Sequence, residues 1–175
     1  MKKFIAGFLV LLLVAVVGVA GVFTYKFANT SPITLIVYMS SDDSPAALKW
    51  GAEKALYGFH PTEEEVQQLN AEAGARYAAL YPDASRARDL LEHFLENGVD
   101  VNAIDTATGS GVSALHSAVL DRNPFAVELL LEHGADPDIE GEQGRTPLEF
   151  ARLLQEKEAG SEVAKIIEIL QGAQS

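Results

Sequence analysis

An acidic cluster in the C-terminal half has the residue types of a calcium site. Asp136, Asp138 and Glu140 alternate along the chain and are followed by a glycine and Glu142. Oxygen ligands at positions one, three and five with glycine at six imitate the start of a calcium-binding loop. The twelfth position of that loop must be a bidentate carboxylate, and here it is Pro147. Because this ligand is missing, we predict neither a metal nor any other cofactor.

The histidines and serines show no catalytic spacing. No two histidines have the H-x-x-x-H or H-x-H spacing of a zinc site, and the sequence has no cysteine. Ser110, between Gly109 and Gly111, lacks the G-x-S-x-G elbow of a nucleophile and indicates a flexible loop. His93 and His133 fall near expected helix ends, where the helix dipole favours histidine. We therefore expect that the chain is not an enzyme.

The elements that carry these residues recur along the chain. Leu115, in the stretch SALHSA, is matched by Leu148 in TPLEFA, and 148 − 115 gives a period of 33. The stretch LLLEHGADPD has an upstream counterpart in HFLENGVDVN, in which Gly98 matches Gly134 at an offset of 36. The three extra positions fall in the glycine-rich run 108–111. An insertion confined to a loop leaves the repeat intact.

A period near 33, a TPLH-like helix start and an L-L-x-x-G-A-D end are typical of ankyrin repeats, and the chain resembles that family at these residues. The resemblance implies an all-α fold, a short ankyrin-repeat solenoid of helix pairs with β-turn fingers. An N-terminal transmembrane or signal helix is expected to precede it. The expected ankyrin repeat domain spans 62–175, with a degenerate first repeat over 62–105, a repeat over 106–138 and a C-terminal capping repeat over 139–172.

The resemblance also implies roles for single repeat residues. In ankyrin repeats a Thr-Pro pair opens the first helix, and the histidine of TPLH joins neighbouring repeats through hydrogen bonds. The start of the middle repeat keeps the hydroxyl at Ser113 and the histidine at His116 but has no proline. The last repeat keeps Thr146 and Pro147 and lacks the histidine, which has no following repeat to join. His116 is thus expected to be structural.

Ankyrin arrays bind proteins through their finger tips and the concave face of the first helices. Carried onto this chain, the resemblance implies a partner-binding set on two fingers and one helix–helix turn. For each residue alone, an ordinary solvated role stays open. The first finger offers Asp100, Asn102, Ile104, Asp105 and Thr106, the second offers Asp136, Asp138, Glu140, Glu142 and Arg145, and the turn offers Asp121, Arg122 and Asn123.

The N-terminal segment 1–28 is expected to enter a membrane. Phe4–Tyr25 contains no charged residue and is long enough to cross a hydrocarbon core of about 30 Å. Lys2 and Lys3 precede it, which favours a cytoplasmic N-terminus. The run is longer than the core of most signal peptides, although Gly18–Ala20 offers a cleavage site. We expect a protein of the bacterial inner membrane with its C-terminal domain in the periplasm, or a soluble periplasmic protein if the leader is cleaved.

Segment 29–61 is predicted to hold a linker, an extended segment and a capping helix. The β-branched residues of Ile33–Met39 favour an extended strap, or a strand that pairs outside the chain. Ala46–Phe59 is predicted to be a helix that shields the open end of the array. A capping box is predicted to open one helix over Thr62–Tyr81, and Asp83 or Ser85 to begin the next.

The charge of the chain limits its partners. All 25 acidic residues lie at Asp42 or later, and the part after Lys26 carries ten basic residues, a formal −15. So negative a surface argues against nucleic acid and anionic lipid and favours a protein partner with a basic surface. Solubility alone is an alternative explanation of the excess.

These observations lead to one expected function and two alternatives. We expect a non-catalytic protein-binding module in the periplasm, an immunity-type inhibitor that binds and neutralises an antibacterial effector such as a secreted lipase or phospholipase. One alternative is a periplasmic adaptor or stress-related factor that supports a partner enzyme. The other is an assembly component whose anchor helix contacts further membrane helices.

Overall fold

The structure, a computed structural model, describes residues 18, 20–141, 144–157 and 160–174. The chain divides into two compact units, Met1–His60 and Pro61–Ser175, which are described separately. Helices are the regular elements of the described ranges. The fingers carry one isolated antiparallel bridge, between Ile104 and Ser113. The predicted all-α class is confirmed for this part of the chain.

Two antiparallel helices, α2 (Pro32–Ser40) and α3 (Ala46–Phe59), pack against each other in the first unit. The prediction of an extended segment over Ile33–Met39 is wrong, because this segment forms most of α2. Ser31 caps the helix by accepting a hydrogen bond from the Thr34 amide at 3.3 Å, and Pro32 occupies the first turn, where its missing amide costs nothing. These start signals outweigh the β-branched composition.

A short helical stretch, residues 20–28, is fastened to α3. A Cβ built on Gly51 would lie 2.6 Å from Cζ of Phe23 and 3.1 Å from Cζ of Phe27, so both rings lie close against this glycine. The two rings also contact each other, with centroids 4.3 Å apart. At the end of α3, Nε2 of His60 lies 3.2 Å from the carbonyl oxygen of Phe27. Only glycine leaves room for this crossing.

The predicted membrane segment Phe4–Tyr25 lies largely outside the described residues, which include only position 18 and positions 20–25 of it. None of the helices in the described ranges combines the length and the apolar character that crossing a bilayer requires.

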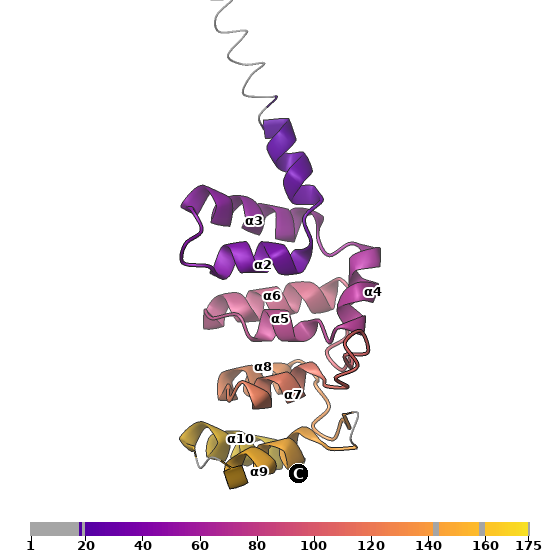
Figure 1. The fold of residues 1–175 in the computed structure, drawn as a ribbon, viewed down its shortest axis with the longest axis vertical. Coiled ribbons are helices and arrows are strands. Elements are labelled where there is room, and N and C mark those ends of the chain that lie inside the picture. Colours follow the sequence, from indigo (N-terminus) through magenta and orange to yellow (C-terminus); the bar gives the residue numbers. More distant parts are fainter. Residues whose placement is uncertain (1–17, 19, 142–143, 158–159, 175) are drawn as a thin grey trace, which may run out of the picture. The chain divides into compact units, whose positions relative to one another are not determined.

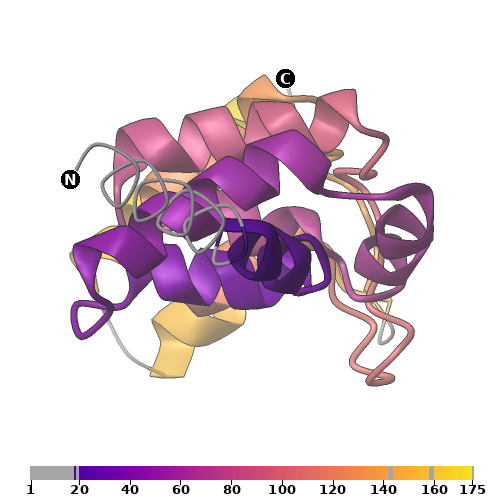
Figure 2. The ribbon, with the colours of Figure 1, turned by 90° about the horizontal axis from the view of Figure 1, so that it is seen from above.

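The second unit is a stack of helix pairs (Figure 1). Within each repeat the shorter first helix packs on the longer second helix, and neighbouring pairs pack on each other. Seen along the stack, the loops that join successive pairs all leave from the same side (Figure 2). The helices are α4 (Glu63–Ala71), α5 (Ala75–Ala79), α6 (Ala84–Glu96), α7 (Ala114–Leu120), α8 (Pro124–Glu132), α9 (Pro147–Lys157) and α10 (Ser161–Ala173).

The core of the stack consists of aliphatic side chains from both rows of helices together with one phenylalanine. Each of these large side chains is at most 1% exposed, and each buried side chain of this size contributes about 1.5–3 kcal/mol to folding. The largest of them are Leu90, Leu91, Phe94, Leu115, Val119, Leu129, Leu130, Ile166 and Leu170.

The helices α6 and α8 end in the same way. Gly98 and Gly134 have φ angles of +96° and +86°, a conformation that glycine adopts without strain. Immediately after them, the amides of Val99 and Ala135 donate to carbonyls one and a half turns back. This shared ending explains the repeated pattern, since its first apolar side chain, Phe94 or Leu130, is buried and the glycine reverses the chain.

The predicted single helix over Thr62–Tyr81 is wrong, because it is broken into α4 and α5. The predicted capping box of Thr62 and Glu65 is present at the start of α4. The break comes at Ala73, whose φ is +52°, and at Gly74, whose amide donates to the Leu69 carbonyl at 2.7 Å. A Cβ on Gly74 would lie 2.7 Å from that same oxygen, so the close turn needs a glycine.

Candidate protein-interaction surface

The two fingers are the loops 99–112, between α6 and α7, and 135–145, between α8 and α9. An asparagine side chain fixes the second finger to the first. Asn102 accepts from the Asp136 amide at 2.8 Å and donates to the Gly134 carbonyl at 3.2 Å. The side chain of Asn102 thereby bonds both the carbonyl of the glycine turn and an amide at the start of the second finger.

Asn70, at the end of α4, makes the same pair of bonds one repeat earlier. It accepts from the Asp100 amide at 2.8 Å and donates to the Gly98 carbonyl at 3.4 Å. The helix α4 therefore takes the place of a finger, beside the two loops in Figure 1. The first helix of the first repeat is α5, and not the longer helix that the sequence predicted.

We expect Asn102→Ala and Asn70→Ala to lower the free energy of unfolding by similar amounts, about 1–2 kcal/mol each. Each change removes two hydrogen bonds that contribute about 0.5–1.5 kcal/mol apiece. Urea titrations followed by far-ultraviolet circular dichroism would measure both. Asn97→Ala is the control, because Asn97 is exposed and its side-chain amide donates to the end of its own helix, at the His93 carbonyl. A loss for Asn102→Ala alone would contradict the equivalence of α4 and a finger.

The first aspartate of each finger closes a local turn. Oδ1 of Asp100 accepts from the Asn102 amide at 2.8 Å, and Oδ1 of Asp136 accepts from the Asp138 amide at 2.9 Å. Asp138 in turn accepts from the side chain of Gln174. All three carboxylates are exposed, as is Glu140 further along the second finger. The turns thus position the carboxylates of Asp100 and Asp136 at the exposed surface.

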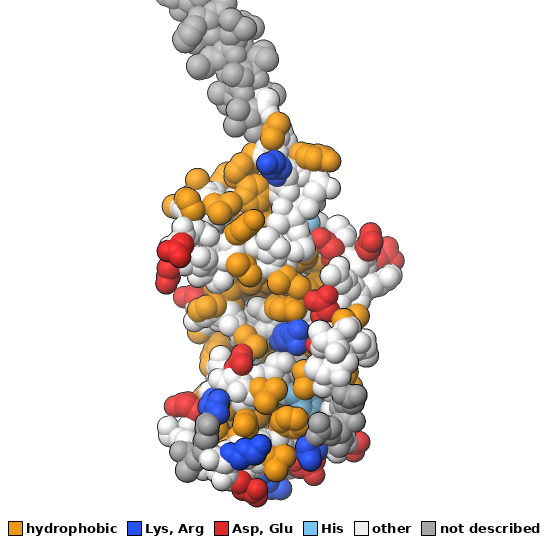
Figure 3. Space-filling model, viewed as in Figure 1, with side chains coloured by type: hydrophobic (Ala, Val, Ile, Leu, Met, Phe, Trp, Pro, Cys, Tyr) orange, Lys and Arg blue, Asp and Glu red, His pale blue; other side chains and the backbone are white. Residues whose placement is uncertain are grey.

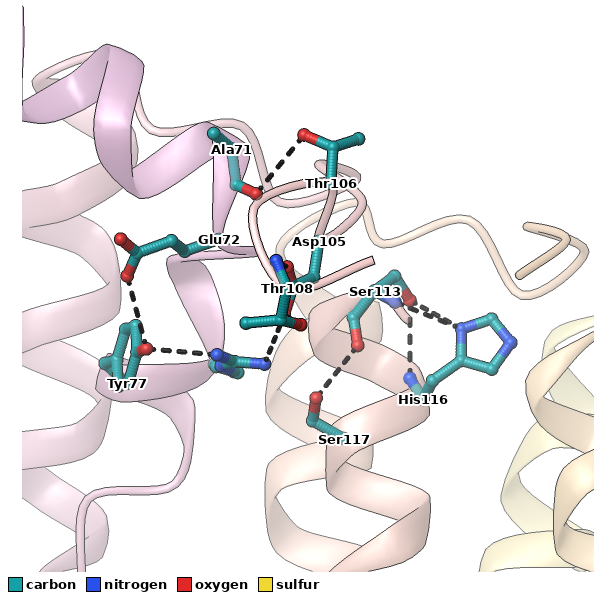
Figure 4. Close-up of polar contacts among 10 residues, drawn as sticks. Ala71, Glu72, Tyr77, Asp105, Thr106, Thr108, Ser113, His116 and Ser117 are labelled. Carbon is teal, nitrogen blue, oxygen red and sulfur yellow. Dashed lines mark hydrogen bonds and ion pairs between the residues drawn. The ribbon is translucent and has the colours of Figure 1, made fainter. Parts of the chain in front are cut away.

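Asp105 lies in the protein interior, and the glycine-rich insertion folds around it (Figure 4). Its side chain is 2% exposed and accepts from the amide of Thr108 at 2.9 Å, from the Thr108 hydroxyl at 2.8 Å and from Nη1 of Arg76 at 3.4 Å. The amide hydrogen bond from Thr108 is the main reason that the pKa of Asp105 lies below its usual value. This carboxylate is not part of the exposed surface.

The partner of Asp105 on α5 is Arg76, a residue that no motif in the sequence marks. Arg76 donates to Tyr77 Oη at 3.0 Å, and the tyrosine hydroxyl lies 3.4 Å from a carboxylate oxygen of Glu72 (Figure 4). A lone arginine in a short helix gives no signal of a loop carboxylate 29 positions later. The spacing alone could not have revealed this network.

Two further candidates of the first finger have structural contacts at its base. The Thr106 hydroxyl donates to the carbonyl oxygen of Ala71 at 3.4 Å (Figure 4), and the Thr106 amide donates to the same oxygen at 2.9 Å, which joins this finger to the end of α4. Its side chain is nevertheless exposed. Ile104 is half-buried at the bridge to Ser113. Of the two, Thr106 stays in the candidate surface.

His116 joins two repeats, as the resemblance implied. Its Nε2 lies 2.9 Å from the carbonyl oxygen of Arg145, and its ring meets Phe150 edge-on at 5.3 Å. The Ser113 amide donates to Nδ1 at 3.4 Å, so Nδ1 is an acceptor and Nε2 carries the proton. The ring is fully buried, and this burial lowers the pKa of His116. The contacts of His116 are those of a neutral ring in a structural role.

The three candidates of the α7–α8 turn differ in exposure. Asn123 is the N-cap of α8 and accepts from the Ala126 amide at 3.1 Å. Asp121 and Arg122 are exposed, and Arg122 has a φ of +51° in the tight turn. The side chain of Asn123 is thus engaged in capping, whereas its two neighbours face solvent.

Arg145 is exposed beside an open depression at the start of α9. The depression is also lined by Glu149, Arg152, Leu153 and Glu156, which mix both charges with one leucine. Glu142, the remaining candidate, lies outside the described residues. Within the described ranges, no three histidine or carboxylate side chains are grouped closely enough to hold a metal ion.

The outer helices carry their own charge pairs. Arg88 on α6 lies 2.8 Å from Glu132 on α8, and Lys165 on α10 lies 3.4 Å from Glu128 on α8. Exposed pairs of this kind contribute about 0–1 kcal/mol each. Exposed carboxylates therefore occur on the outer helices as well as on the fingers, among them Asp89, Glu96 and Glu168.

Stacked helix pairs, fingers on one side and an asparagine repeated between fingers define a repeat module of the protein-binding class. The family model for ankyrin repeats (3 copies) matches residues 77–168. The chain belongs to the ankyrin repeat family. Domains of this family are generally non-catalytic modules of protein interaction.

Several known proteins share the repeats. The chain is 44% identical over 73 residues, 42% of its length, to potassium channel AKT3 of Oryza sativa subsp. japonica, covering 7% of that protein. It is 32% identical over 90 residues, 51% of its length, to human BCL-6 corepressor-like protein 1, covering 5%. It is 44% identical over 65 residues, 37% of its length, to human 2-5A-dependent ribonuclease, covering 8%. The match thus spans less than a tenth of each of these three proteins.

Proposed function

We propose that this chain is a membrane-tethered or periplasmic ankyrin module that binds another protein and neutralises it. In its specific form, the chain is an immunity-type inhibitor of an antibacterial effector, for instance a secreted lipase or phospholipase. The membership in the ankyrin repeat family supports the general role of binding. The specific role rests on the distribution of charge and on the N-terminal sequence.

The observation that carries the proposal is the acidic edge of the fingers, which comprises the exposed carboxylates of Asp100, Asp136, Asp138 and Glu140. The unit to which they belong has 22 acidic and eight basic residues, a formal −14. A rigid surface with this charge suits the mouth of a basic cleft. It can cover that mouth, and its field speeds the encounter with a positively charged partner.

The proposed location follows from the first 25 residues. Two lysines precede an uncharged run, an arrangement that favours a cytoplasmic N-terminus with the rest of the chain across the membrane. A retained anchor and a cleaved signal peptide both deliver the second unit to the periplasm.

The test changes the acidic edge without disturbing its turns. Asp100→Asn and Asp136→Asn keep the Oδ1 acceptors of the two local turns, and Asp138→Lys with Glu140→Lys reverses the other two charges. The full-length variant would be assayed by co-purification with the product of the adjacent gene and by growth protection against it. We expect at least about tenfold weaker binding, which corresponds to 1.4 kcal/mol.

The matched control has the same change in net charge on the outer helices. Asp89→Lys, Glu96→Lys and Glu168→Lys alter exposed residues of α6 and α10, and should leave binding within about twofold of the unchanged chain. Equal losses in both variants would show that only the net charge matters. Full binding by the finger variant would place the interface elsewhere.

The sign of the effect separates inhibition from assistance. If the purified chain raises or protects the activity of its partner, it is an adaptor and the inhibitor proposal is wrong. A neighbouring gene whose product has no toxicity in the periplasm would also contradict the immunity role.

A further inference from the structure

The first unit has a surface unlike that of the second. Of the nine large apolar side chains exposed in the described ranges, seven lie in the first unit, and only Leu120 and Leu153 lie in the second. Figure 3 shows hydrophobic side chains gathered over the α2–α3 hairpin. The first unit has five lysines and three carboxylates, a formal +2, against −14 for the second. The net negative charge of the chain therefore comes from the second unit.

The exposed face of α3 has the composition of a membrane interface. Trp50, Lys54 and Tyr57 follow one another at the i, i+4, i+7 spacing of a single helix face, and all three are exposed, Trp50 to 61%. Tryptophan and tyrosine are enriched where bilayers meet water, and lysine extends its charge towards the headgroups. We call these three residues the α3 stripe.

The α3 stripe lies next to the point where the apolar run ends. Phe23, inside the run Phe4–Tyr25, contacts Gly51, which directly follows Trp50. The contact between the Phe27 carbonyl and His60, at the end of α3, is a second point at which stretch 20–28 is held against this helix. On the helical stretch 20–28, Val22 and Tyr25 are 61% and 71% exposed, and Lys26 follows them in solvent. If the run lies in the bilayer, this crossing brings α3 to the bilayer surface.

We propose that the α2–α3 hairpin is a membrane-bound collar, in which the α3 stripe lies in the headgroup layer of the bilayer that holds the apolar run. The occupant of the exposed apolar surface is thus lipid. The collar rests on the membrane segment of the proposed function and does not depend on which protein the repeats bind. Residues 20–60 hold three lysines and three carboxylates, so this part of the chain lacks the strong negative charge of the second unit, which anionic lipid would repel.

Trp50 is the only tryptophan of the chain, so its fluorescence reports on the collar directly. The full-length chain would be reconstituted into vesicles of phosphatidylethanolamine and phosphatidylglycerol, with and without lipid brominated near the headgroup. We expect the emission of Trp50 to shift to the blue, to lose quenching by aqueous iodide and to gain quenching by the brominated lipid. Emission at the wavelength of hydrated tryptophan, or shielding from both quenchers, would overturn the collar.

A matched probe in the second unit serves as the control. Trp50→Phe combined with Leu153→Trp moves the single tryptophan to an exposed position on α9, where iodide should quench it and brominated lipid should not. Equal quenching of both probes by lipid would overturn the proposal, because lipid would not distinguish the units. Alkaline extraction of membranes tests the anchor, and co-purification tests the partner, so each can fail separately from the collar.

Discussion

Replacing Asp105 by alanine is expected to lower the free energy of unfolding by about 3 kcal/mol. The change removes two charge-assisted hydrogen bonds from Thr108 and leaves the guanidinium of Arg76 without its carboxylate. Removing one partner of a buried ion pair costs about 3–5 kcal/mol, and the partial exposure of Arg76 places this site at the lower end. Urea titration of the full-length chain in mild detergent, followed by circular dichroism, would measure the loss.

The exposed Asp121, at the end of α7, is the control for this experiment. Asp121→Asn should change the free energy of unfolding by less than about 0.5 kcal/mol. The pH dependence supplies a second readout. Because the pKa of Asp105 is lowered in the folded chain, its ionised form stabilises the fold above about pH 4, and this stabilisation is lost as the pH falls further. An alanine variant as stable as the original chain would show that the loop does not depend on Asp105.

Replacing His116 by alanine is also expected to cost about 3 kcal/mol. The side chain is fully buried, and its loss leaves the Ser113 amide without its acceptor, deprives the Arg145 carbonyl of a donor and opens a cavity against Phe150. The last repeat should loosen first, because this contact joins it to the middle one. Hydrogen exchange should therefore speed up in α9 and α10 before it does in α6.

The pH dependence of stability tests whether His116 is neutral. Its pKa is lowered in the folded chain, so the unfolded chain binds a proton more readily, and stability falls as the pH drops below about 6.5. This part of the loss should be absent from His116→Ala. The variant His133→Gln lacks a different histidine and should still show the loss of stability at low pH. A histidine that is charged in the folded chain would give the opposite trend, with stability rising as the pH falls.

The parts of the fold that the sequence predicted are those in which one residue has one local role. The glycine turns after α6 and α8, the capping box at Thr62 and the bond from His116 to the next repeat are all present. Each depends on a residue type that few alternatives can replace at that position. The resemblance to ankyrin repeats that these residues carry therefore predicted the arrangement of the helix pairs.

The errors come from positions where two local signals compete. The β-branched residues after Ser31 favour a strand, yet the cap at Ser31 and Pro32 starts a helix whose apolar residues pack on α3. The helical pattern continues past Ala71, yet the turn at Gly74 ends it. In both cases a cap or turn at a single position outweighs the composition of the whole segment.

The candidate surface was predicted as a list of finger residues, and the structure separates them by their contacts. Asp105 is buried, and Asn102 and Asn123 have their side chains engaged with the backbone. Whether a finger residue faces solvent depends on how its loop closes. The sequence showed the insertion at 108–111. It gave no sign that this insertion folds around Asp105.

The bonds of Asn70 bear on how such arrays change in length. The helix α4 presents to the first glycine turn the same acceptor and donor that Asn102 presents to the second. The first boundary of the array therefore uses the same pair of hydrogen bonds as an internal one. A repeat duplicated after α4 would find both bonding partners already in place, so that a gene encoding this domain can gain or lose a unit without a new terminus having to arise.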